Sequence, residues 1–71
     1  MPTFQPRLYL NREIINIPEK PVNYSDKKMA IEVLQEAIKK YSEALGGEVI
    51  SISDTGHYKT IYRNIPNRLY I

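Results

Sequence analysis

The chain has 71 residues, a formal net charge of +2 and no cysteine, and 42% of its residues are hydrophobic. This length and balance are typical of one small globular domain, so we expect a single domain over residues 1–71. The lack of cysteine excludes disulfides and thiolate metal sites, and a single histidine excludes a site built on several histidines of one chain. A core of this size supplies roughly 3–5 kcal/mol of net stability, so self-association would be a useful addition.

The N-terminal residues lack the basic and then apolar order of a secretory signal, and no apolar run is long enough to cross a bilayer. A chain without cysteine suits a reducing compartment. We therefore expect a cytoplasmic protein with no membrane partner.

The first regular pattern is an alternation of apolar and polar residues, as in a half-buried strand. Leu8 and Leu10 are in one phase, and Ile15 and Ile17 are in the opposite phase. A turn at Asn11-Arg12 reconciles the two phases by placing Leu8 opposite Ile15. The alternative is one long strand with a bulge.

A loop over Pro18 to Tyr24 leads to an amphipathic helix, expected from Asp26 to Leu45. Ser25 is the predicted N-cap, because its hydroxyl can accept a hydrogen bond from an amide of the first turn. Gly46-Gly47 is predicted to end the helix, since glycine adopts the left-handed cap without a Cβ clash. The predicted apolar stripe consists of Ala30, Val33, Leu34, Ala37, Ile38, Tyr41 and Leu45.

Two further strands follow the helix. Glu48–Ser53 is predicted to be a strand with Ile50 and Ile52 on one face, and Asp54–His57 is typical of a turn. Tyr58–Ile65 is rich in residues that favour strands, so the two runs should pair as a hairpin.

Together these elements predict an α+β fold: a small antiparallel sheet with one amphipathic helix packed on one face. The element order is ββαββ, or βαββ if the N-terminal run is one strand. Pro66 interrupts the last strand, and residues 66–71 are expected to form a short extended tail or an edge strand.

Two patterns in the turn could indicate catalysis, and neither is persuasive. Asp54-Thr55-Gly56 matches the short signature of aspartic proteases, but it lacks their apolar lead-in and suits a hairpin turn equally well. Ser53, Asp54 and His57 could be arranged as nucleophile, orienting acid and base. One turn, however, cannot supply the pocket that such triads need. We expect no catalytic residue, no metal site, no cofactor and no enzymatic activity.

The chain contains no acidic residue after Asp54, while aromatic and basic residues gather there. On a regular strand Tyr58 and Tyr62 share one face, and Lys59 and Arg63 share the other. The candidate partner-binding residues are Tyr58, Lys59, Tyr62, Arg63, Arg68 and Tyr70.

Three interpretations of these six residues remain open. Tyrosine and arginine often anchor protein interfaces, which predicts a non-enzymatic interaction module that binds a protein partner, with a homodimer as one form. Exposed tyrosines beside cations would instead suit weak nucleic-acid binding, for which the net charge is small. In the third interpretation, the tyrosines pack under the helix and the cations are simply solvated.

Overall fold

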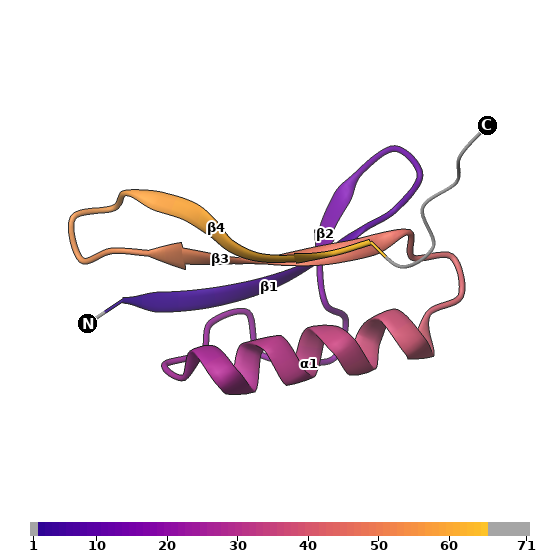
Figure 1. Cartoon of the computed structure of the whole chain (residues 1–71), viewed down its shortest axis with the longest axis horizontal. Coiled ribbons are helices and arrows are strands. Elements are labelled where there is room, and N and C mark those ends of the chain that lie inside the picture. The colour runs from indigo at the N-terminus through magenta and orange to yellow at the C-terminus, as the bar shows by residue number, and fades with distance from the viewer. Residues whose placement is uncertain (1, 66–71) are drawn as a thin grey trace.

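The computed structural model describes residues 2–65, which form one helix and a four-stranded antiparallel sheet (Figure 1). The elements are β1 (Thr3–Tyr9), β2 (Ile14–Asn16), α1 (Lys27–Lys40), β3 (Gly46–Ile52) and β4 (Tyr58–Asn64). The strand order is β2-β1-β3-β4, and α1 packs against β1 and β3. The expected α+β class is confirmed, with the order ββαββ. The predicted tail over 66–71, with Arg68 and Tyr70, lies outside the described residues.

The N-terminal run forms a hairpin and not a single strand. Leu8 pairs with Ile15, as the opposite phases of the two apolar pairs predicted. The turn is closed by a hydrogen bond of 2.8 Å from the Leu10 amide to the Glu13 carbonyl oxygen. The alternative of one bulged strand is therefore wrong.

Strand β1 begins at Thr3, before the alternating pattern. Phe4 exchanges two backbone hydrogen bonds of 2.8 Å with Tyr24, which ties the loop before α1 to the start of the sheet. Pro6 has the same backbone orientation as Phe4, so its nitrogen points away from β3 into the gap between Tyr24 and β2. Its missing N–H therefore interrupts no ladder, and proline is tolerated in this strand.

Helix α1 is shorter than predicted at both ends. Asp26 is the N-cap in place of Ser25, and its carboxylate accepts a 3.0 Å hydrogen bond from the Lys28 amide. The last helical residue is Lys40, not Leu45. The Leu45 amide instead donates to the Tyr9 carbonyl oxygen at 2.8 Å, so this segment has already joined the sheet.

The prediction that Gly46-Gly47 caps the helix is wrong, because both glycines begin β3. A Cβ on Gly47 would meet the carbonyl oxygen of Arg7 and the side chain of Leu34. Glycine at this position therefore allows α1 and β1 to approach β3 closely.

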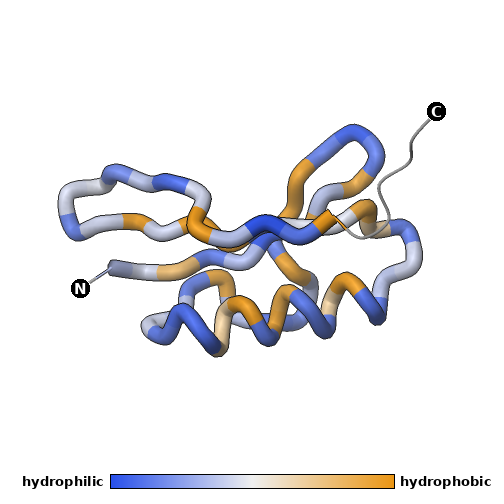
Figure 2. Tube along the Cα trace, in the orientation of Figure 1, coloured by the Kyte–Doolittle hydropathy of each residue, from blue (hydrophilic) through white to orange (hydrophobic). Residues whose placement is uncertain are grey.

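The core lies between α1 and the sheet. Figure 2 shows the alternation of hydrophobic and hydrophilic residues along α1 that produces its apolar stripe. The buried cluster consists of Leu8, Ile17, Ala30, Leu34, Ala37, Ile38, Ala44 and Val49. Of the predicted stripe, Val33, Tyr41 and Leu45 are only half-buried. Among the described residues no helix is long and apolar enough to span a membrane.

Cross-strand partners share a face of a sheet, so the register divides the strands into two sets of side chains. Leu8 and Val49 face the helix. Arg7 and Glu48, which pair with each other, face the opposite side. We call that opposite side the open face, because α1 packs on the other side of the sheet (Figure 1).

Candidate interaction surface

Strand β4 is irregular, and this irregularity decides which face its side chains occupy. Val49 pairs with Tyr62, but the next residue, Ile50, pairs with Thr60. Ile61 is therefore an extra residue, and the strand contains a β-bulge. A bulge reverses the alternation of side chains on either side of it.

The bulge divides the predicted binding residues differently from a regular strand. Tyr58, opposite Ile52, and Arg63, opposite Glu48, lie on the open face. Lys59 and Tyr62 lie on the helix side. The prediction that Tyr58 and Tyr62 share a face is wrong, and so is the prediction that Lys59 and Arg63 share the other.

Tyr62 belongs to the edge of the core. It is half-buried and packs against the apolar cluster, and the Gln35 side-chain amide of α1 donates to its hydroxyl oxygen at 3.1 Å. For this tyrosine the interpretation as a residue packed under the helix is correct. Lys59 is exposed on the same side and pairs with Ser51.

Tyr58 and Arg63 are accessible on the open face. Tyr58 is 69% exposed, which makes it one of the large hydrophobic residues that the described part of the fold leaves uncovered. The Arg63 side chain is 58% exposed. These two residues are the described members of the predicted set that can meet a partner on this face.

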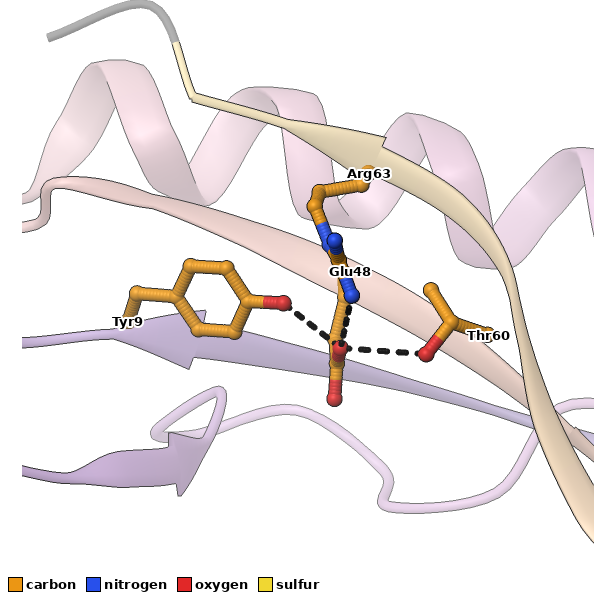
Figure 3. A network of polar contacts seen from close by, with 4 residues as sticks. All are labelled: Tyr9, Glu48, Thr60 and Arg63. Carbon is orange, nitrogen blue, oxygen red and sulfur yellow. Dashed lines mark hydrogen bonds and ion pairs between the residues drawn. The ribbon is translucent and has the colours of Figure 1, made fainter. Parts of the chain in front are cut away.

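Glu48 lies at the centre of the open face and is only 7% exposed (Figure 3). Its Oε1 atom accepts a hydrogen bond of 2.6 Å from the Tyr9 hydroxyl and one of 3.3 Å from the Thr60 hydroxyl. The Arg63 Nη2 atom lies 3.9 Å from the same oxygen. A buried carboxylate needs such partners, because an uncompensated charge away from water is costly. The contacts therefore hold three strands' side chains in fixed positions around one oxygen.

The surroundings of Tyr9 raise the pKa of its hydroxyl above the ordinary value. Burial is the main cause that raises the pKa of its hydroxyl, and the hydrogen bond to the Glu48 carboxylate raises it further. The nearby Arg63 guanidinium acts in the opposite direction, lowering the pKa. Tyr9 is thus held as a neutral hydrogen-bond donor.

A second set of polar contacts adjoins this network on β1. The Arg7 Nη2 atom donates to the Gln5 Oε1 atom at 3.2 Å. The Gln5 amide nitrogen in turn donates to the Asn23 Oδ1 atom at 2.7 Å. The loop before α1 is therefore linked to the open face through side chains as well as through backbone.

Glu48, Tyr9 and Thr60 are functional candidates that the sequence reasoning missed. The signal was available for Glu48: it has the same strand parity as Ile50 and Ile52, which were expected to share a face. Tyr9 and Thr60 could not be assigned from spacing, since their meeting depends on the β1–β3 register and on the bulge in β4.

The turn between β3 and β4 uses its polar side chains locally. Ser53 Oγ and Thr55 Oγ1 are 3.0 Å apart, and Thr55 Oγ1 lies 3.0 Å from His57 Nδ1. The His57 amide donates to Ser53 Oγ at 3.2 Å. These contacts close a compact turn, and Ser53 is not directly bonded to the imidazole as a catalytic nucleophile would be to its base.

Within residues 2–65, no group of three or more histidine, cysteine or acidic residues is placed to hold a metal ion. Comparison with protein-family models, curated proteins and solved structures found no match to this chain.

Proposed function

We propose that this chain is a non-enzymatic, cytoplasmic interaction module that binds a protein partner through the open face and the C-terminal hairpin. The simplest partner is a second copy of the chain. The observation that carries the proposal is the exposure of Tyr58 and Arg63 on one face, beside the buried carboxylate of Glu48. Arg68 and Tyr70 remain predicted contributors from the sequence.

The chemistry of the open face supports a protein partner. Tyrosine and arginine are the residue types that most often dominate binding energy at protein interfaces. Arg63 already has a carboxylate near one side, which limits the conformational freedom that binding would remove. Apolar area is also present, since Ile14 on β2 is 54% exposed and Ile52 beside Tyr58 is half-buried.

The alternative is weak nucleic-acid binding by the aromatic and basic residues of β4. A stacking platform would require several aromatic rings and cations on one surface. The bulge puts Tyr58 and Tyr62 on opposite faces of the sheet. It likewise separates Lys59 from Arg63. The geometry therefore favours a protein partner over a nucleic acid.

Sedimentation equilibrium over a range of concentrations tests the self-associating form. We expect the apparent mass of the wild-type chain to rise from one copy toward two, and the double variant Tyr58→Ser, Arg63→Ser to stay at one copy. The matched control is Met29→Ser, Lys39→Ser, which removes an exposed apolar residue and an exposed cation from α1. It should behave as the wild type does.

A wild-type chain that stays monomeric at every concentration contradicts self-association and leaves a different protein as the partner.

Fluorescence anisotropy with a labelled single-stranded oligonucleotide tests the alternative of nucleic-acid binding. Binding that falls steeply with salt and is lost in Lys59→Ser, Arg63→Ser would favour nucleic acid.

A further inference from the structure

A hollow of about 200 Å³ lies at the distal end of the β3–β4 hairpin, away from Glu48, and shares only Tyr58 with the open-face residues described above. Its lining residues are Ser51, Ser53, His57, Tyr58 and Lys59. The hairpin extends beyond the first turn of α1, so the helix does not cover this end of the sheet (Figure 1).

The lining has the composition of an anion site. Each of the five residues carries a side chain that can donate a hydrogen bond, and none of the five is acidic. Ser51 and Lys59 are cross-strand partners, so a hydroxyl and an ammonium lie side by side on the helix side of the hairpin. Ser53, His57 and Lys59 are all exposed.

We propose that this hollow binds a tetrahedral dianion, such as the phosphate of a phosphate monoester. Lys59 and a protonated His57 supply two positive charges, and the two serine hydroxyls supply neutral donors. Two cations match a dianionic monoester better than a singly charged phosphodiester. Charge-assisted hydrogen bonds of this kind are the main source of affinity for phosphate groups on protein surfaces.

The hydrogen-bond chain in the turn couples anion binding to the protonation of His57. In the neutral tautomer that carries its proton on Nε2, Nδ1 accepts from the Thr55 hydroxyl, Thr55 accepts from Ser53, and the Ser53 proton is used inside the turn. When Nδ1 is protonated, it donates to Thr55 Oγ1, and Thr55 turns its proton toward Ser53 Oγ. That oxygen also accepts from the His57 amide. The Ser53 hydroxyl proton is then free to point into the hollow and donate to an anion.

Other titratable side chains lie near this switch. Lys59 and Tyr58 line the hollow together with the imidazole, and Asp54 lies in the same turn. A bound dianion favours the protonated imidazole, and by linkage protonation favours the anion. Affinity should therefore fall as pH rises and the imidazole loses its proton.

The experiment is a titration of the ¹⁵N-labelled full chain with sodium sulfate, followed by amide chemical shifts at pH 5.5 and pH 8. Sulfate keeps two negative charges over this range, so a change in affinity reports on the protein. We expect saturable shifts confined to residues 51–59, with affinity about fivefold weaker at pH 8, the size of one partly exposed charge pair. Sodium chloride at equal ionic strength should produce no saturable shifts.

Variants separate the parts of the proposal. Lys59→Met should weaken sulfate binding by about fivefold, and the control Lys39→Met on α1 should not. His57→Gln should abolish the dependence on pH. Ser53→Ala should reduce that dependence, because the freed hydroxyl is missing, whereas Ser42→Ala should leave it unchanged.

A phosphoserine peptide should compete with sulfate, and its unphosphorylated form should not. No saturable shifts, or equal binding by the Lys59→Met variant, would overturn the site. If the ratio of the sulfate affinities at pH 5.5 and pH 8 is the same in Ser53→Ala as in the wild type, the hydrogen-bond switch is overturned. Tighter binding of a thymidine oligonucleotide than of the phosphoserine peptide would overturn the assignment to a monoester.

Discussion

The helix side of the sheet and the open face are built from alternate residues of the same strands, yet they bury different chemistry. Under α1, Leu8 of β1 and Val49 of β3 meet the helix in an apolar cluster. On the open face the neighbouring residues of the same strands are Tyr9 and Glu48, which meet through a hydrogen bond of 2.6 Å. The helix side is therefore held by apolar packing, whereas the open face combines the contacts to one carboxylate oxygen with a buried aliphatic residue, Ile50, which is 3% exposed.

This difference separates stability from binding. Apolar burial contributes about 25 cal/mol per Å² and is not directional, so the cluster under α1 should supply most of the free energy of folding. A buried carboxylate with its partners contributes little net stability, because desolvation opposes the attraction between charges. It does fix the positions of the side chains around it. The open face is thus better suited to present Arg63 and its neighbours than to hold the fold together.

The largest expected effect is on the helix side, from Leu34→Ala. Leu34 is fully buried between α1 and Gly47 of β3. Its truncation should cost about 2–5 kcal/mol, which is comparable to the roughly 3–5 kcal/mol available to a domain of this size. Urea unfolding followed by circular dichroism should find the variant largely unfolded. The exposed Lys39→Ala serves as control and should unfold as the wild type does.

An intermediate effect is expected on the open face, from Tyr9→Phe. The change removes the hydroxyl that donates to Glu48 and should cost about 1 kcal/mol at neutral pH. If its cost equals that of Leu34→Ala, the two faces contribute equally to stability and the comparison fails.

The pH dependence of the same variant sharpens this result. Because folding raises the pKa of Tyr9 above its ordinary value of 10.0, its contribution is fully present below pH 10. That contribution is lost as pH rises through the higher folded value, when the hydroxyl must ionise beside a carboxylate. Wild-type stability should therefore fall on alkaline titration, and Tyr9→Phe should show a smaller fall. Tyr24, whose pKa is raised by burial, remains in both proteins and accounts for part of what is left.

The apolar periodicities predicted the helix side well. The opposite phases of Leu8 and Ile15 predicted the β1–β2 register, and the stripe on α1 predicted which helix residues pack on the sheet. The glycine pair was misassigned for a physical reason: Gly47 is required by the close approach of α1 to β3, a tertiary demand that local helix-capping rules do not contain. The open face was harder to predict, because a single extra residue, Ile61, reverses the side-chain alternation in β4. Neither the composition nor the residue spacing of this strand indicates a bulge there.

The smallest expected effect on stability is that of Arg63→Ala, and this variant tests the separation most directly. Its side chain is 58% exposed and its Nη2 atom lies 3.9 Å from Glu48 Oε1, so the ion pair is partly screened by water. Its loss should lower the free energy of unfolding by about 0.2–1 kcal/mol, while Tyr9 and Thr60 still hold the carboxylate. Self-association measured by sedimentation should nevertheless weaken clearly in this single variant, because arginine side chains at interfaces often carry a large share of the binding energy. A loss of stability clearly larger than that of Tyr9→Phe, with association unchanged, would instead make Arg63 a structural partner of Glu48 and move the binding surface away from the open face.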